Sequence, residues 1–155
     1  MMNTALMCVL AGCALFLTIP ATAATDDAAT TIIGMEKAAL DRWGKGDPGG
    51  FLEITAPDVV YFDPFMAKRL DGLEALRKLY ESFRGQIHID HYDLIDPKVT
   101  IVGDMALLTF NFVSHGSEGD MKWNTTEVYQ RTAAGWRIIH SHWSLTQPKL
   151  APAEK

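Results

Sequence analysis

The second half of the chain most constrains the fold, because it carries four consecutive β-rich segments and no helical pattern. These segments cover residues 87–103, 105–116, 121–132 and 136–147, and each is rich in β-branched and aromatic residues. The short sequences GD, GSEGD and AAG lie between them and are typical of turns. The pattern predicts an antiparallel sheet in which strands that follow one another in the chain also pair with each other.

Helical patterns occur only in the first half of the chain. Apolar residues recur at spacings of three and four over residues 26–45 and again over residues 73–85, where Gly85 provides the stop. Between these segments, Pro48 is suited to begin a short helix that ends before Pro57. The sequence therefore predicts three helices ahead of the sheet.

Two short β-rich pieces lie among these helices, DVVYFDP at residues 58–64 and RLDG at residues 69–72. The order of helices and strands predicts an α+β domain, with three helices packed on one side of a curved, mostly antiparallel sheet. A sheet that curls around helices leaves a conical cavity, and cavities of this kind hold ligands.

The first 24 residues have the composition of a secretory signal peptide, with no charge and an apolar run that breaks at Pro20. We expect cleavage after Ala23 or Ala24 and a periplasmic or secreted product with no membrane anchor. A competing interpretation is LAGC at residues 10–13, which resembles a lipoprotein box with Cys13 as the lipidated residue. The apolar run continues beyond this box, which favours ordinary cleavage.

Removal of the leader would leave about 130 residues, enough for one domain over residues 25–147 and a loose tail over residues 148–155. Both cysteines, Cys8 and Cys13, lie in the leader. A cleaved chain would therefore have no disulfide, no thiol catalysis and no cysteine-metal site. The net charge of −5 comes without a basic stripe, so no nucleic-acid partner is expected.

Three segments carry a family resemblance: GDPGGFLEITAPDVVYFDPF at 46–65, LDGLEALRKLY at 70–80 and TEVYQRTAAGWRIIHSHWS at 126–144. In these the chain resembles the nuclear-transport-factor-2-like superfamily, which includes SnoaL-like cyclases, ketosteroid isomerases and the association domain of calcium/calmodulin-dependent kinase. The resemblance implies a cone-shaped fold that encloses a pocket. It leaves the activity open, because this superfamily places many functions on one scaffold.

Asp63 is the first candidate for chemistry. It shares a strand face with Val59 and Tyr61, and the resemblance to ketosteroid isomerase places it at the position of that family's catalytic base. A carboxylate enclosed by apolar walls is a better proton acceptor than one in water. The alternative is that Asp63 and Pro64 form only a strand-ending turn, in which the Asp oxygen accepts backbone N–H bonds.

Glu127 is the second candidate, since the resemblance aligns it with the second cavity carboxyl of the isomerase. A protonated Glu127 would donate a hydrogen bond to an enolate oxygen while Asp63 takes the proton, because coupled carboxyls separate in pKa. The alternative is a surface glutamate paired with a cation.

The tyrosines depart from the isomerase pattern. That family's oxyanion tyrosine falls at Ala39 and a supporting tyrosine at Thr55, whereas a third is retained as Tyr80. Tyr61, which lies on the strand face of Asp63, is the remaining candidate for a phenol donor, and its alternative role is packing.

Strand alternation divides the last segment between two faces, with Ile139, Ser141, Trp143 and Leu145 on one and His140, His142 and Ser144 on the other. The resemblance places the Trp143 position inside the cavity, so the two histidines would face outward. Relatives pair into homodimers through this outer face, and the residues expected on it here are His140, His142, Asn111, Asn124 and Thr126.

We expect no metal site. From the outer face only His115 is available as a further ligand, and a zinc site needs more. His88 and His91 flank the start of the long β-rich segment at residues 87–103, where one of them could reach the cavity rim, and they receive no assigned role.

The expected cavity wall consists of Trp143, Trp123, Phe110, Phe112, Leu108, Leu76, Tyr80 and Trp43. The function expected from these residues is an exported domain that binds a small, largely apolar molecule. As an enzyme it would be a cofactor-free isomerase, dehydratase or cyclase, with Asp63 as base and Glu127 or Tyr61 as donor. The alternatives are a non-catalytic binding or assembly module, and a scaffold whose core is filled.

Overall fold

The computed structural model describes residues 21–146, with side chains from residue 27 onward. In chain order the elements are α1 (Ala21–Trp43), α2 (Gly49–Ile54), β1 (Thr55–Phe62), β2 (Leu70–Asp71), α3 (Leu73–Glu81), β3 (His91–Val102), β4 (Met105–Gly116), β5 (Gly119–Thr132) and β6 (Gly135–Leu145). Both cysteines and the tail at 148–155 lie outside the described residues, as does the expected leader except for its last four positions. Within the described part, no helix is long and apolar enough to cross a membrane.

The strands form one sheet in the order β2-β1-β6-β5-β4-β3. Strands β3 to β6 pair antiparallel with their neighbours in the chain, as the sequence predicts. Strand β1 pairs parallel with β6 and antiparallel with the short β2. The structure thus confirms the α+β fold. Its helices lie in the N-terminal half of the described residues and pack on a curved, unclosed sheet.

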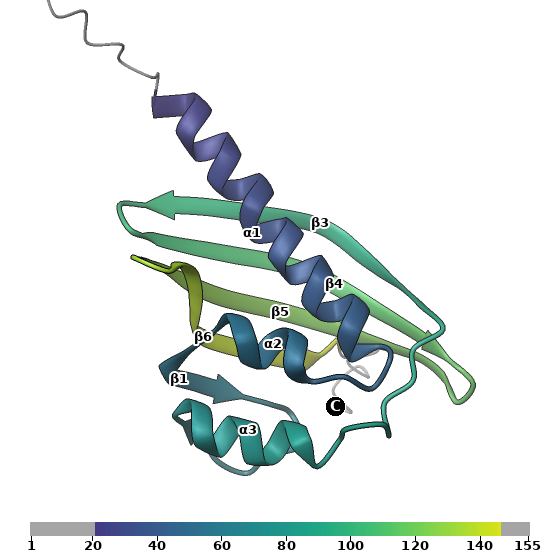
Figure 1. Cartoon of the computed structure of the whole chain (residues 1–155). Coiled ribbons are helices and arrows are strands. Elements are labelled where there is room, and N and C mark those ends of the chain that lie inside the picture. The colour runs from purple at the N-terminus through teal and green to yellow at the C-terminus, as the bar shows by residue number, and fades with distance from the viewer. Residues whose placement is uncertain (1–20, 147–155) are drawn as a thin grey trace, which may run out of the picture.

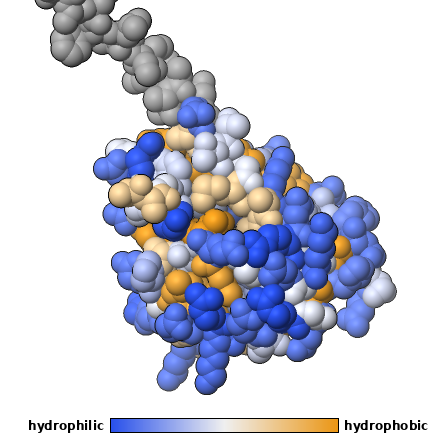
Figure 2. All heavy atoms as spheres, in the orientation of Figure 1, coloured by the Kyte–Doolittle hydropathy of each residue, from blue (hydrophilic) through white to orange (hydrophobic). Residues whose placement is uncertain are grey.

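The three helices lie on the same side of the sheet, and α1 runs diagonally across it in front of β3 and β4 (Figure 1). The apolar stripe of α1 faces the sheet, so that Ile32 and Leu40 are buried together with Val59 of β1 and Leu108 of β4. Figure 2 shows the helix side of the molecule, where hydrophilic side chains predominate and hydrophobic ones show between them. The core therefore lies between helices and sheet, and the site is built at one end of this core.

Helices α1 and α2 approach closely at Gly50, where an added Cβ would lie 2.9 Å from the Cα of Ala39. An exposed ion-pair network holds the same junction: Arg42 pairs with Asp47 at 2.7 Å and with Glu53 at 2.7 Å. The pKa of Asp47 is lowered to about 2. The main cause is the hydrogen bond from Arg42, and the backbone N–H of Gly49 and the side chain of Arg84 add to it. This junction fixes the helical wall of the cavity described below.

A β-bulge in β6 interrupts the alternation of inward and outward side chains that was expected along this strand. Val128 of β5 pairs with His140, but the next residue of β5 pairs with Ile138, which leaves Ile139 as the extra residue. Ile138 therefore faces the core and is 2% exposed, whereas Ile139 was expected inside. Beyond the bulge the alternation resumes as expected, with Ser141 buried and His142 exposed.

The edge strand β3 also contains an irregularity. Its register against β4 shifts between Ile95 and Lys98, and Asp96 in this stretch has a φ of 47°. Pro97, which has no backbone N–H, sits at the shift. Strand β3 begins at His91, later than expected, because the preceding segment bonds elsewhere: the N–H of Ile89 donates to the carbonyl of residue 44, at the end of α1.

Candidate functional site

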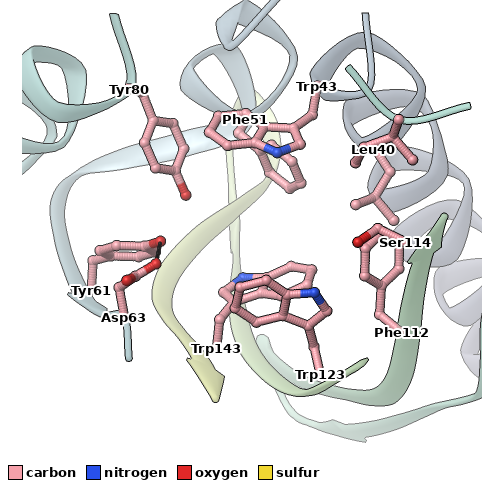
Figure 3. Close-up of a pocket in the computed structure, with 11 residues that line it drawn as sticks. Leu40, Trp43, Phe51, Tyr61, Asp63, Tyr80, Phe112, Ser114, Trp123 and Trp143 are labelled. Atoms are coloured by element: carbon pink, nitrogen blue, oxygen red, sulfur yellow. Dashed lines mark hydrogen bonds between the residues drawn. The ribbon is translucent and has the colours of Figure 1, made fainter. Parts of the chain in front are cut away.

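A cavity of about 100 Å³ opens between the helices and the concave face of the sheet. Figure 3 shows its lining, which consists of Leu40, Trp43, Phe51, Tyr61, Asp63, Tyr80, Ile89, Phe112, Ser114, Trp123 and Trp143. Seven of these eleven residues are aromatic, and one, Asp63, carries a charge. The cavity is therefore an aromatic chamber with a single acidic group in its wall.

Regular secondary structure positions the aromatic rings. Strand alternation directs Tyr61 from β1, Phe112 from β4 and Trp143 from β6 to the concave face. From the helical side, Trp43 at the end of α1 and Phe51 of α2 complete the chamber, with ring centroids 6.0 Å apart. Because these rings are set on strands and helices, the chamber is largely preformed.

Tyr61, Asp63 and Tyr80 form the polar wall of the chamber. The Tyr61 hydroxyl donates to Oδ2 of Asp63 at 2.9 Å, and the Tyr61 and Tyr80 rings meet edge to face with centroids 5.6 Å apart. Burial, followed by the nearby phenol of Tyr80 and carboxylate of Asp63, raises the pKa of Tyr61 above its usual value. Burial likewise raises the pKa of Tyr80, so both phenols keep their protons at neutral pH.

Both interpretations of Asp63 describe part of what the structure shows. Its Oδ1 accepts a hydrogen bond from the N–H of Phe65 at 2.8 Å, which is the turn role, while Oδ2 lies at the cavity. The side chain is half-buried at the rim, and so is less enclosed than the sequence suggested. The turn bond fixes the direction in which the carboxylate faces the chamber.

A second group of polar side chains is buried in the core. Tyr129 of β5 donates to Oε2 of Glu36 at 2.8 Å and lies 3.1 Å from Oε2 of Glu127. Ser141 donates to Oε1 of Glu127 at 2.8 Å. Glu36 is 0% and Glu127 1% exposed, so the alternative interpretation of Glu127 as a surface glutamate paired with a cation is wrong.

The two buried carboxyls both have raised pKa values. Burial is the main cause that raises the pKa of Glu36 well above its usual value, and the charge of Glu127 adds to it. Burial also raises the pKa of Glu127, but hydrogen bonds from Glu36, Ser141 and Tyr129 oppose the shift. Among the described residues, Oε1 of Glu36 has no hydrogen-bond partner of its own. The direction of these shifts favours protonation of Glu36 over protonation of Glu127.

A hydrogen-bond chain links this carboxyl pair to the chamber. The indole N–H of Trp143 donates to Oγ of Ser141 at 3.1 Å, and Ser141 in turn donates to Glu127. Glu127 thus lies behind Trp143 and does not line the cavity. Its structural role is to fix the indole ring that forms one wall.

Comparisons with known proteins now place the chain. The sequence profile of the SnoaL-like domain matches residues 38–148, which is most of the chain. The chain belongs to the SnoaL-like domain family. No protein of curated function matches this SnoaL-like domain at a significant level.

Solved structures resemble this SnoaL-like domain over most of their length. A protein from Parabacteroides distasonis, provisionally named a ketosteroid isomerase, is 42% identical and superposes with a TM-score of 0.69, covering 76% of this chain and 86% of its own. The CaMKII hub of S. rosetta is 23% identical, with a TM-score of 0.63 and coverage of 76% and 95%. A provisionally named dehydratase of the NTF2-like family from Streptomyces avermitilis is 21% identical, with a TM-score of 0.66 and coverage of 80% and 99%. The last two likenesses show the fold alone.

The SnoaL-like domain brings together five of the eight expected wall residues, namely Trp43, Tyr80, Phe112, Trp123 and Trp143. Leu76, Leu108 and Phe110 do not line the cavity, because they are buried in the surrounding core at 2%, 0% and 5% exposure. Four wall residues were not predicted from the sequence. They are Leu40 of α1, Phe51 of α2, Ile89 and Ser114.

Glu36 was the largest omission, and its position in the sequence contains the signal. It follows Ile32 by four residues and precedes Leu40 by four, so it lies on the apolar stripe of α1. A glutamate on the buried face of a helix needs a partner inside the protein, and Glu127 on the inward face of β5 is that partner.

On the outer face of the sheet lie the expected pairing residues, with Asn111, Asn124 and His142 exposed and Thr126 and His140 half-buried. The ring of Phe62 lies against both histidines, with centroids 6.1 Å from His140 and 5.5 Å from His142. Partial burial, followed by the neighbouring His142, lowers the pKa of His140, so its imidazole is neutral at pH 7.

Two of the remaining histidines, His88 and His115, lie against carboxylates. His115 bridges two strands, with Nε2 3.1 Å from Asp93 and Nδ1 2.8 Å from Asp120, and these bonds raise its pKa. His91 stacks on the ring of His115, and His88 lies 3.1 Å from Asp90. Over residues 21–146, no group of three or more His, Cys, Asp or Glu side chains is arranged to hold a metal ion.

Proposed function

We propose that this SnoaL-like domain binds a small, largely apolar molecule in its aromatic chamber and transfers a proton on it without a cofactor. Asp63 is the general base in this proposal. The observation that carries it is the convergence of Asp63, Tyr61 and Tyr80 on one wall of an otherwise apolar cavity. A few polar groups in an apolar cavity are the usual composition of a small-molecule site.

The three polar residues have different parts. The single hydroxyl proton of Tyr61 is donated to Asp63, so Tyr61 orients the base. Tyr80 faces the same space, and because its pKa is raised it remains a hydrogen-bond donor for a substrate oxygen. An isomerase, dehydratase or cyclase requires this combination of one base and one donor. The provisional name of the structure that is 42% identical, a ketosteroid isomerase, is compatible with it.

The test compares the wild type with Asp63→Asn in a screen of apolar carbonyl and hydroxyl compounds, read by thermal shift and by turnover. Asp58→Asn is the matched control, since Asp58 is an exposed aspartate of the same strand. Ligands should stabilise all three proteins, whereas turnover should fall at least about a hundredfold only in Asp63→Asn. Equal turnover in Asp63→Asn, or binding without turnover in the wild type, contradicts the catalytic role.

We further propose that the domain forms a homodimer through the outer face of the sheet. Large apolar side chains are exposed on the outer face of β1 and β4, including Phe62 at 38%, Leu107 at 39% and Met105 at 44%. Exposed apolar groups next to neutral polar ones are typical of surfaces that pair. A dimer of this kind leaves the chamber accessible, because the proposed interface and the chamber lie on opposite faces of the sheet.

A further inference from the structure

We infer that the ligand of the aromatic chamber carries a positive charge, as a quaternary ammonium or a protonated amine, and that the aromatic walls hold this group beside Asp63. The inference rests on the proposed function in one respect, that the chamber binds a small molecule. It adds the chemical class of that molecule, which the proton-transfer proposal leaves open.

The arrangement of the rings is the first support. Neighbouring walls of a box meet at near right angles, and here Trp123 and Trp143 are inclined at 80° and Phe112 and Trp143 at 88°. On the polar wall, the rings of Tyr61 and Tyr80 are inclined at 89°. In Figure 3 the rings surround an open centre. Aromatic boxes of this kind bind ammonium groups, because the ring faces carry negative electrostatic potential.

The charge around the chamber is the second support. Asp63 is the one charged residue in the lining, and no described lysine, arginine or histidine forms an ion pair with it. After burial, the charges of the Glu127 and Asp63 carboxyls contribute to the raised pKa of the Tyr80 phenol. The field in the chamber is therefore negative, which attracts a cation and opposes an anion.

This field also bears on proton transfer. When Asp63 takes a proton from a neutral ligand, Asp63 becomes neutral and the negative charge passes to the ligand, near the buried carboxyl pair. When Asp63 takes a proton from a ligand that carries a cationic group, the product ligand has no net charge, because its own positive charge offsets the electron pair left behind. A cationic ligand therefore avoids placing an anion in the negative field of the chamber.

The size of the chamber limits the ligand. A volume of about 100 Å³ has room for roughly seven to ten water-sized groups. A head group with three or four methyl substituents on nitrogen fits this space, whereas a fused polycyclic skeleton exceeds it.

The experiment measures calorimetric binding of choline and of its neutral isostere, in which carbon replaces the nitrogen. Shape and apolar area are matched, so the difference reports the charge. Choline should bind the wild type at least about tenfold more tightly than the isostere. This ratio should shrink about threefold or more in Asp63→Asn and in Trp123→Leu, and should be unchanged in Asp58→Asn. Thermal unfolding of each variant shows that it is folded.

The outcomes separate this inference from the proposed function. If the isostere binds as tightly as choline, or if only neutral carbonyl compounds bind, the ligand is not a cation and the chamber is still a binding site. If choline binds preferentially and the preference survives Asp63→Asn and Trp123→Leu, the cation is held outside the chamber and the inference is wrong. If no small molecule binds the wild type, the inference and the proposed function both fail.

Discussion

Single side chains in the core determine how this domain responds to pH. Glu36 and Glu127 are buried in the core, and burial raises the pKa of both carboxyls. A buried carboxyl with a raised pKa binds its proton more tightly in the folded state than in the unfolded one. The folded state is therefore favoured at low pH, and this advantage is lost as the pH rises above the unfolded value of about 4.5.

Glu36→Gln tests this dependence. The amide keeps the shape of the protonated acid and donates to Glu127 without titrating, so the variant should be more stable than the wild type at pH 7, by about 1 to 3 kcal/mol. Denaturant unfolding between pH 4 and pH 8 measures it: the wild type should lose up to about 1.4 kcal/mol per pH unit relative to the variant. Glu118→Gln, at an exposed turn, is the control and should follow the wild type. Parallel curves for all three proteins would contradict a raised pKa at Glu36.

Ser141→Ala tests the link between the carboxyl pair and the chamber wall. Ser141 donates to Glu127 and accepts from Trp143, so its loss should cost about 1 to 3 kcal/mol of unfolding free energy. Tryptophan fluorescence should change as well, because the indole N–H of Trp143 loses its acceptor. Ser144→Ala on the outer face of the same strand should change neither quantity. An unchanged fluorescence spectrum in Ser141→Ala would show that Ser141 does not orient the ring.

Sequence patterns could predict which aromatic side chains point inward, but not which of them line the cavity and which are buried in the core. Strand alternation and the resemblance direct Trp123, Trp143 and Phe112 inward, yet the same reasoning also selects Phe110 and Leu108, which are core. Whether an inward side chain meets a cavity or another side chain depends on the packing of the helices above it. That packing is a property of the assembled domain, which local periodicity does not contain.

Helices α1 and α2 are held together by a close backbone contact as well as by the burial of apolar side chains. The contact of α1 with α2 at Gly50 leaves no room for a side chain, since the nearest atom to an added Cβ is backbone and cannot rotate away. Gly50→Ala should therefore lower the unfolding free energy by about 1 to 3 kcal/mol, measured by denaturant unfolding.

Gly34→Ala is the matched control within α1. Nothing lies within 4 Å of a Cβ at this position, and alanine favours the helix, so the variant should gain about 0.5 to 1 kcal/mol. Equal effects at the two glycines would show that the α1–α2 contact is looser than the structure indicates.

The sequence predicts which segments are helices or strands better than it predicts where each helix or strand begins and ends. The four meander strands follow from β-branched and aromatic runs divided by glycine turns, and α1 and α3 follow from their apolar spacing. The bulge at Ile139 has no local signal, because two consecutive isoleucines satisfy either register. The late start of β3 depends on a hydrogen bond from Ile89 to the end of α1, which is a contact between distant parts of the chain.

The proposed dimer is the prediction at the scale of the whole molecule. His142→Glu places a charge on the outer face beside Phe62, and in a symmetric dimer it buries two such charges. Light scattering after size exclusion should show the wild type as a dimer and the variant as a monomer at the same concentration. Ser117→Glu, in the exposed turn between β4 and β5, is the control and should remain a dimer. A variant that elutes with the mass of the wild type would contradict this use of the face.

The two borders of the sheet set a limit on how such molecules can associate. One border is β2, which has only two residues, and the other is β3, which Asp96 and Pro97 interrupt where an incoming chain would need regular donors. Neither border offers a template on which a further copy could be added end to end. The sheet borders therefore disfavour open-ended growth by strand addition, which leaves pairing through a sheet face as the route to association.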